Sequence, residues 1–217
     1  MWELAKSNLK HNMALPAAVS AAILLMTPVL FGTANLDRET SAIPLETFLS
    51  LVGIALFTPV FQPEERKEID DLVSSKYVSA GVVWLIRTAC AMVFVTAFVG
   101  VFVFSMRLRL CDVSFVLFVG TVADAVFLGG LGMLGAACAG NTVTGYMAAL
   151  VYYGINCGAG MKLGKFYLFS MCHSEYEPEI WLFGAGTFLI LAALAVRQGK
   201  RRLLQENTVS GPSECGL

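Results

Sequence analysis

The sequence predicts an all-α integral membrane protein. Of its 217 residues, 57% are hydrophobic and only 14% are charged, and the mean hydropathy is +0.70. A soluble domain of this length does not bury so much apolar surface. The apolar residues also form long continuous runs close to the roughly 20 residues that a helix needs to cross a bilayer. A transmembrane β-barrel is disfavoured, because its strands are about 10 residues long and alternate polar with apolar positions.

Six apolar runs predict six transmembrane helices within a single domain at residues 1–204. The predicted spans, in chain order, are residues 13–34, 44–61, 78–104, 113–138, 142–160 and 180–196. The residues that follow, 205–217, are polar and predict a flexible cytoplasmic tail.

The N-terminal residues before the first span predict an amphipathic elbow helix on the membrane surface. Trp2, Ala5, Leu9 and Met13 recur at helical spacing, and charged side chains take the other faces. An ordinary frayed N-terminus is the alternative. Cleavage of the first run as a signal peptide is disfavoured, because secretory apolar cores are typically about 7–15 residues long.

The lysine and arginine residues near the span ends favour cytoplasmic N- and C-termini. With that orientation, the cytoplasmic basic residues are Lys6, Lys10, Arg66, Lys67, Lys76, Arg197, Lys200, Arg201 and Arg202. Fewer basic residues lie outside, namely Arg38, Arg107, Arg109, Lys162 and Lys165. Arg107 and Arg109 are the pair that disagrees with the rule. The absence of a further basic patch disfavours a nucleic-acid partner.

Residues 63–77, between the second and third spans, predict an amphipathic helix on the cytoplasmic membrane surface. Pro63 suits the first helical position, and Glu64 and Glu65 suit the first turn, where the helix dipole favours carboxylates. Ile69 and Leu72 share an apolar face with neighbours at helical spacing. A charged helix fixed between two spans is suited to contact a soluble partner, although a solvated loop helix without a partner would have the same pattern.

No nucleotide-binding motif is found in the sequence. Residues 159–166 resemble a phosphate-binding loop but lack its first glycine and its final hydroxyl residue. Gly130, Gly132 and Gly135 have the spacing of a dinucleotide-binding loop, yet they lie inside an apolar span. We expect small residues four apart to serve helix packing instead, and these are Gly132, Ala136, Gly140, Gly154 and Gly158.

Arg87 and Asp124 lie inside the third and fourth spans and are predicted to form an ion pair. An unpaired charge at the bilayer centre is costly, and the two positions fall at similar predicted depths. The alternative is that each side chain faces water or reaches the interface separately.

The sequence predicts neither a metal site nor an enzyme. The six cysteines show no zinc-type spacing. Cys172 and His173, with Glu175 and Glu177, are interpreted as an ordinary outer loop rather than metal ligands. An intramembrane protease is disfavoured because neither histidine, His11 or His173, lies in a predicted span.

Two stretches of the chain resemble a known family. They are FTPVFQPEERKEIDDLVSSKYVS at residues 57–79, followed by LIRTA at 85–89, and GNTVTGYMAALVYYGINCGAGMKLGKFYLFSM at 140–171. Together with the six-span layout, these resemble the membrane (permease) subunits of bacterial ABC exporters, the ABC type-2 permease family.

The resemblance implies that residues 63–77 form a coupling helix that docks on a separate ATP-binding subunit. The coupling residues would be Glu64, Glu65, Arg66, Glu68, Ile69, Leu72 and Lys76. ATP and Mg²⁺ would be bound by that partner subunit, and this chain would hold no cofactor. A second coupling surface between the fourth and fifth spans is doubtful, because residues 139–141 are so few.

The resemblance further implies an exporter in the bacterial plasma membrane. Two such chains, identical or different, would form the pathway as a dimer within the lipid bilayer. The cargo would be a peptide, a lipid-linked molecule or an amphiphilic drug. The alternative is a non-transporting accessory, assembly or sensor membrane protein that binds a soluble partner through residues 63–77.

Overall fold

The computed structural model describes residues 13–32, 36–65, 80–173 and 177–209, and within these ranges the chain is helical and contains no strand. The longer α-helices are α2 (Ala14–Phe31), α6 (Ala80–Leu108), α7 (Phe115–Ala139), α8 (Thr142–Ala159) and α9 (Glu177–Val209). Between α2 and α6 run α3 (Arg38–Pro44), the π-helical turn η1 (Leu45–Leu49), α4 (Leu51–Phe57) and the 3₁₀ segment η2 (Thr58–Glu65). Two further 3₁₀ segments, η3 (Gly160–Phe166) and η4 (Met171–His173), connect α8 to α9.

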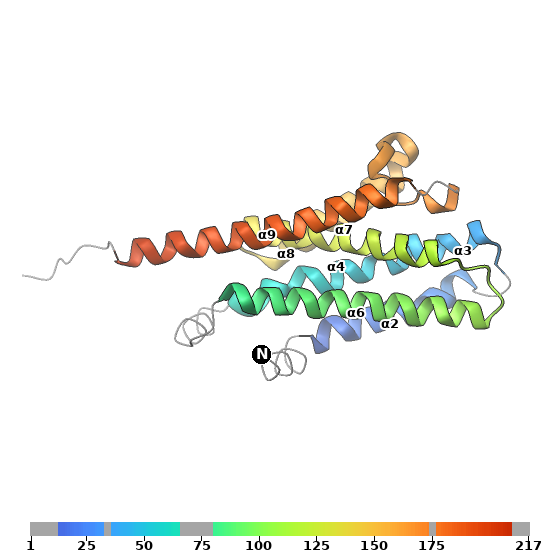
Figure 1. Ribbon diagram of the computed structural model, residues 1–217, viewed down its shortest axis with the longest axis horizontal. Coiled ribbons are helices and arrows are strands. Elements are labelled where there is room, and N and C mark those ends of the chain that lie inside the picture. The colour runs from blue at the N-terminus through green and yellow to red at the C-terminus, as the bar shows by residue number, and fades with distance from the viewer. Residues whose placement is uncertain (1–12, 33–35, 66–79, 174–176, 210–217) are drawn as a thin grey trace, which may run out of the picture.

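Successive long segments run in opposite directions along one axis (Figure 1). We call the end at which α2 begins and α9 ends the proximal end, and the opposite end, where α3 and η4 lie, the distal end. The segment from α3 to η2 returns to the proximal end, and the chain then alternates through α6, α7, α8 and α9. Both ends of the described chain therefore lie at the same end of the bundle.

Five segments are long and apolar enough to cross a membrane, which confirms five of the six predicted spans. These are Ala14–Phe31, Arg38–Gln62, Gly81–Leu108, Phe115–Ala139 and Glu177–Leu203. The remaining predicted span forms α8, a helix of 18 residues. Polar residues that include Tyr152, Tyr153 and Asn156 make α8 less apolar than the other five.

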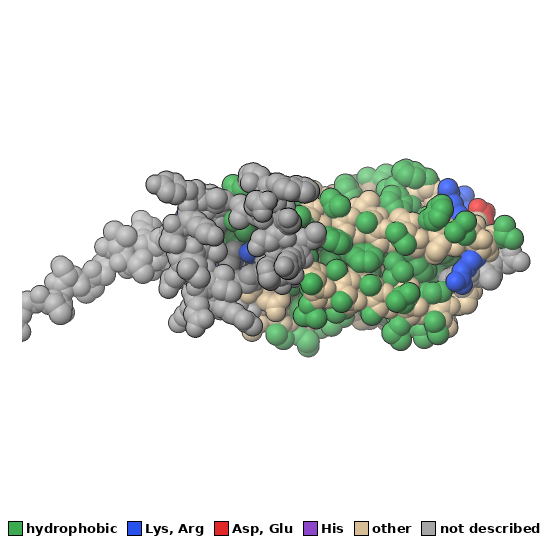
Figure 2. Space-filling view, turned by 90° about the horizontal axis from the view of Figure 1, so that it is seen from below, with side chains coloured by type: hydrophobic (Ala, Val, Ile, Leu, Met, Phe, Trp, Pro, Cys, Tyr) green, Lys and Arg blue, Asp and Glu red, His purple; other side chains and the backbone are tan. Residues whose placement is uncertain are grey.

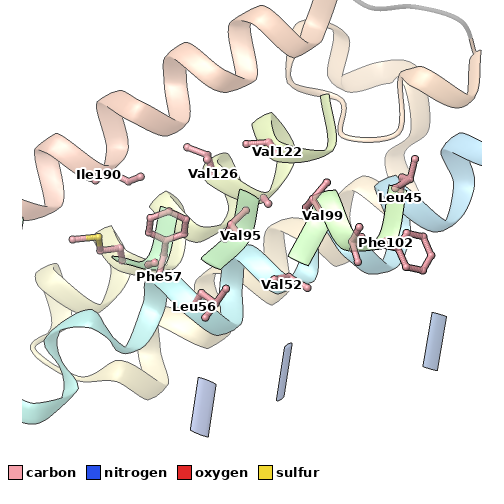
Figure 3. Packing of buried hydrophobic residues seen from close by; sticks show 14 of the residues in the cluster. Leu45, Val52, Leu56, Phe57, Val95, Val99, Phe102, Val122, Val126 and Ile190 are labelled. Atoms are coloured by element: carbon pink, nitrogen blue, oxygen red, sulfur yellow. The ribbon is translucent and has the colours of Figure 1, made fainter. Parts of the chain in front are cut away.

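Apolar side chains cover the surface of the bundle as well as fill its core. Figure 2 shows them along the visible face, with charged side chains gathered at the distal end. In the core, α7 packs against α4, α6, α8 and α9. Figure 3 shows Val122 and Val126 of α7 among Val95 of α6, Phe57 of α4 and Ile190 of α9. A bundle with an apolar exterior is stable only in an apolar solvent, as in a bilayer.

Glycines allow α7 to approach its neighbours at backbone distance. A Cβ added at Gly53 of α4 would collide with the backbone of Ala125, and one at Gly186 of α9 would lie 2.7 Å from the nitrogen of Phe127. The predicted role of Gly132 and Ala136 in packing is confirmed, because both lie against Gly145 of α8. Gly140 instead ends α7 with φ of 72°, a left-handed conformation that glycine adopts at little cost.

Several predicted features fall partly or wholly outside the described residues. The elbow helix lies outside them, as do residues 66–79 of the amphipathic segment and residues 210–217 of the tail. The predicted tail at 205–217 starts too early, because α9 continues to Val209. A helix can continue beyond its apolar run because water solvates the polar side chains of its last turns while the backbone hydrogen bonds stay intact.

Candidate functional site

Two of the predicted coupling residues lie at the proximal end of the bundle. Glu64 and Glu65 are the last two residues of η2, whereas Arg66, Glu68, Ile69, Leu72 and Lys76 lie outside the described residues. η2 ends and α6 begins at the proximal end, where α9 also finishes (Figure 1).

The predicted ion pair between Arg87 and Asp124 is absent. Arg87 donates from Nη1 to the carbonyl oxygen of Val60 at 3.2 Å, while neither carboxylate oxygen of Asp124 has a hydrogen-bond partner. At the helical rise, Arg87 lies about 10 Å from the proximal start of α6, whereas Asp124 lies about 23 Å from the proximal end of α7. The prediction assumed a shared 30 Å core, and the helices are longer than that.

Asp124 lies instead in a cluster of three buried carboxylates. Glu46, Asp124 and Glu179 each place a carboxylate oxygen within 4.8 Å of the other two. Asp124 is completely buried, Glu46 likewise, and Glu179 is 6% exposed. We call these three residues the carboxylate cluster. They come from η1, α7 and α9, and all three segments are among those long and apolar enough to span a membrane.

Glu46 is positioned by the π-helical turn η1. Pro44 lacks a backbone N–H, and the ordinary helical hydrogen-bond pattern gives way to a wider turn in which the N–H of Ser50 reaches the carbonyl of Leu45 at 3.2 Å. Tyr153 of α8 donates its hydroxyl to the carbonyl oxygen of Thr47 at 2.8 Å, which braces the turn from outside. The wide turn directs the Glu46 side chain into the bundle.

Both oxygens of Glu46 accept main-chain hydrogen bonds from the loop that precedes α9. The N–H of Met171 donates to Oε1 at 2.5 Å, and the N–H of Cys172 donates to Oε2 at 3.2 Å. Two N–H donors favour the ionised form of a carboxylate. Glu46 is therefore the member of the cluster whose two oxygens the protein itself satisfies.

Glu179 lies in the first turn of α9, where the helix dipole favours a carboxylate. Its Oε1 accepts a hydrogen bond from the hydroxyl of Ser170 at 3.0 Å, while its Oε2 has no hydrogen-bond partner. Ser170 belongs to the same loop that binds Glu46. The loop thus approaches the cluster from the distal side and contacts two of its three members.

Asp124 lies in the middle of α7, about 14 Å from its distal start at the helical rise. One turn before it, Gly120 provides the room that the loop requires, because a Cβ there would collide with the Met171 side chain and lie 3.1 Å from Cδ of Glu179. Both Asp124 oxygens remain unpartnered in this closely packed surrounding. Asp124 is the member of the cluster whose burial the protein does not compensate.

The electrostatics of the cluster require a positive charge or protons. Two carboxylate charges 4.8 Å apart repel by about 3–4 kcal/mol at an effective dielectric constant near 20. Buried charges in proteins are paired, neutralised or bound to metals, because desolvation is otherwise too costly. Either protons or a cation must therefore occupy the space among Glu46, Asp124 and Glu179.

Cys172 and His173 border the cluster without joining it. The Cys172 thiol contacts His173 Nδ1 at 3.0 Å and the carbonyl oxygen of Phe169 at the same distance. Burial, and after it the nearby Glu46 carboxylate, raise the pKa of the Cys172 thiol to about 12. Thiolate is the metal-binding form of cysteine, so this thiol is a poor ligand near neutral pH.

Sequence reasoning found Asp124 and missed both of its partners. Glu46 lies inside the predicted span 44–61, so an acidic residue in an apolar run was an available signal. Glu179 lies one residue before the predicted span 180–196 and has the pattern of an ordinary boundary residue. Glu46 and Glu179 join Asp124 in the carboxylate cluster only through tertiary packing, which the spacing of residues in the sequence does not reveal.

Comparisons with protein-family models, with curated proteins and with solved structures find no match to this chain. The resemblance to exporter permeases therefore stays a prediction from the residues quoted above.

Proposed function

We propose that this chain is the transmembrane subunit of an ATP-driven exporter in a bacterial plasma membrane. The observation that supports the proposal is that η2 ends and α6 begins at the proximal end, where α9 also ends (Figure 1). Arg197, Lys200, Arg201 and Arg202 lie in the C-terminal half of α9. Basic residues mark the cytoplasmic side of membrane proteins, so the coupling segment would face the cytoplasm.

This position suits mechanical coupling to a soluble ATPase. The segment is fixed at one side to η2, which packs against α7 and α8, and at the other side to α6. A push on such a segment moves several helices together, because helix packing is bistable rather than continuously deformable. ATP and Mg²⁺ would be bound by the partner subunit.

A dimer of such chains would provide the pathway. Gly154 and Gly158 lie four residues apart on α8, both exposed, with no atom within 4 Å of a Cβ added at either. Exposed apolar residues that include Val151 and Ile155 lie on the same helix. Small residues at this spacing let membrane helices approach closely, which supports α8 as the contact with a second permease chain.

The polar interior of the bundle is consistent with transport. Ionisable residues inside spans are expensive and usually functional, and the carboxylate cluster supplies three of them. The cargo class stays open among peptides, lipid-linked molecules and amphiphilic drugs.

Co-purification tests the proposal. The full chain is expressed with the ATPase encoded beside it, and a double variant, Glu64→Ala with Glu65→Ala, is compared with the wild type. We expect the variant to retain less ATPase and to lose most of the ATP turnover that the membrane subunit stimulates. Glu177→Ala, at the distal end, is the matched control and should change neither quantity.

Two results would count against the proposal. If binding and turnover are unchanged in the double variant, the coupling role of the segment is wrong. If the partner binds through residues 63–77 but no cargo moves in vesicles, the chain is an accessory protein rather than a transporter.

A further inference from the structure

We propose that the carboxylate cluster of Glu46, Asp124 and Glu179 is a binding site for a hard divalent cation of the calcium class. The proposal concerns the distal end of the bundle and does not depend on the exporter function. It is carried by the unpartnered oxygens, by the chemistry of the donors and by their spacing.

The unpartnered oxygens point to a ligand among the three residues. Asp124 is completely buried, and neither of its oxygens has a hydrogen-bond partner. Oε2 of Glu179 is buried without a partner as well. Glu46 differs, because its two oxygens are occupied by the N–H groups of Met171 and Cys172. The protein therefore compensates one carboxylate and leaves three oxygens of the other two unsatisfied.

The donors are hard. All three side chains offer carboxylate oxygen, the ligand that calcium, magnesium and manganese prefer over imidazole or thiolate. The oxygens without a hydrogen-bond partner belong to Asp124 and Glu179. One oxygen of Glu46 lies within 4.8 Å of an oxygen of each. One divalent cation would leave a net charge of −1, which the two N–H donors to Glu46 partly offset.

The coordination chemistry favours calcium over magnesium. The three oxygens lie within 4.8 Å of one another, a separation that one divalent cation can bridge. Ca²⁺ binds oxygen at about 2.3–2.6 Å with flexible geometry, whereas Mg²⁺ demands near-ideal octahedral ligands at about 2.1 Å and gives up its waters reluctantly. A buried set of three carboxylates therefore suits calcium better than magnesium.

Protons are the competing occupant. A single proton shared between Asp124 and Glu179 engages two oxygens and leaves the third unsatisfied. A cation engages all three and also lies beside Glu46, an oxygen of which is within 4.8 Å of both carboxylates. A bound cation therefore accounts for more of the unpartnered oxygens than a shared proton does.

Cation binding would fasten the distal end of the bundle. Glu46 belongs to the segment that continues into α4, Asp124 to α7 and Glu179 to α9. The loop from Phe169 to Cys172 closes over the same residues through Ser170, Met171 and the Cys172 backbone. An ion there would cross-link three helices and their covering loop.

The test uses the full wild-type chain in nanodiscs, freed of divalent ions with a chelator. Thermal unfolding is followed while CaCl₂, MgCl₂ or an ionic-strength-matched amount of KCl is added, and bound calcium is counted with radioactive Ca²⁺. We expect about one Ca²⁺ per chain and a rise of roughly 5 °C or more at saturation. Magnesium should give a smaller rise and potassium none.

Isosteric variants assign the site. Asp124→Asn and Glu179→Gln should each weaken calcium binding at least tenfold, while Glu177→Gln, two residues from Glu179 and exposed, should bind calcium as the wild type does. If Asp124→Asn does not fold, Glu179→Gln and the wild-type count still decide the question.

Three outcomes would overturn the proposal. The wild type could show neither bound calcium nor a shift, or both substituted proteins could bind calcium unchanged. Acidification could also stabilise the protein with no response to any cation, which would assign the cluster to protons. None of these outcomes bears on ATPase binding at the proximal end, so the exporter proposal is judged separately.

Discussion

Glu46 and Met171 are 125 positions apart in the chain, yet the main-chain N–H of Met171 donates to Oε1 of Glu46 at 2.5 Å. The next residue, Cys172, donates its N–H to Oε2 of the same carboxylate. These two hydrogen bonds fasten the loop before α9 to the π-helical turn η1 through one side chain.

Neutralising Glu46 should expose Cys172 to thiol reagents. Because burial and the Glu46 charge raise the pKa of the Cys172 thiol to about 12, only about one thiol in ten thousand is ionised at pH 8. Glu46→Gln removes the carboxylate charge, which lowers the pKa of the Cys172 thiol. The NH₂ group of the glutamine cannot accept a hydrogen bond, so one of the two backbone N–H groups loses its partner. We expect maleimide labelling of Cys172 at pH 8 to become at least several-fold faster.

The labelling is measured by mass spectrometry in a protein whose other cysteines are replaced by serine. Glu177→Gln is the control, since it removes an exposed carboxylate at the start of α9. Equal rates in the wild type and in Glu46→Gln would show that Glu46 neither shields the thiol nor holds the loop.

A methyl group at Gly53 should destabilise the bundle strongly. A Cβ at this position would collide with the backbone of Ala125, which cannot rotate out of the way as a side chain can. Overpacking costs about 1–3 kcal/mol, and a backbone collision belongs at the upper end. We expect Gly53→Ala to lower the unfolding midpoint by roughly 6 to 12 °C.

Gly184→Ala provides the comparison, because a Cβ at Gly184 of α9 would have no atom within 4 Å. Its unfolding midpoint should change by no more than a degree or two, or rise slightly, since alanine favours a helix by about 1 kcal/mol over glycine. Similar losses in the two variants would mean that the close approach of α4 to α7 at Gly53 is not what sets the stability.

Much of the fold was predictable because its main driving force, the transfer of apolar side chains out of water, can be read from the composition. Apolar runs near 20 residues predict spans, and five such spans are present. The helix ends were less predictable. Apolar residues stop near the membrane edge, but α6 and α9 continue through polar turns, because solvated helical turns keep their hydrogen bonds. The predicted depths of Arg87 and Asp124 failed because α7 is longer than the core of about 30 Å that the prediction assumed.

The candidate site was only partly predictable. A lone acidic residue in an apolar span identified Asp124, and the same signal at Glu46 was available. No local sequence pattern predicts that a π-helical turn directs Glu46 inward. Nor does any predict that Gly120 makes space for Met171 beside Glu179. Such geometry depends on which helices become neighbours, and three residues from distant segments meet only after packing.

Bulky residues on the exposed face of α8 should weaken self-association. Gly154 and Gly158 offer a small surface that a second chain would contact, and valine at both positions would hold the two helices apart. We expect Gly154→Val with Gly158→Val to shift the protein from dimer toward monomer by at least tenfold in dissociation constant. Fluorescence energy transfer between labelled chains in vesicles measures this shift.

Gly184→Val is the matched control, because Gly184 is also exposed but lies on α9. It should leave energy transfer unchanged. Loss of association in the control but not in the α8 variant would assign the dimer contact to α9 instead.

The carboxylate cluster predicts that Asp124 is energetically coupled to Glu179 and not to Arg87. The repulsion between Asp124 and Glu179 exists only when both carboxylates are present, so neutralising either one removes it entirely. In a chelator-containing buffer, Asp124→Asn and Glu179→Gln should therefore combine to less than the sum of their separate effects, by about 1 kcal/mol or more. Asp124→Asn and Arg87→Met should instead add within about 0.5 kcal/mol, since the two side chains lie at different depths. Unfolding free energies of the four proteins in each cycle, measured in mixed micelles, provide the comparison, and coupling in the Arg87 cycle alone would restore the ion pair that the sequence predicted.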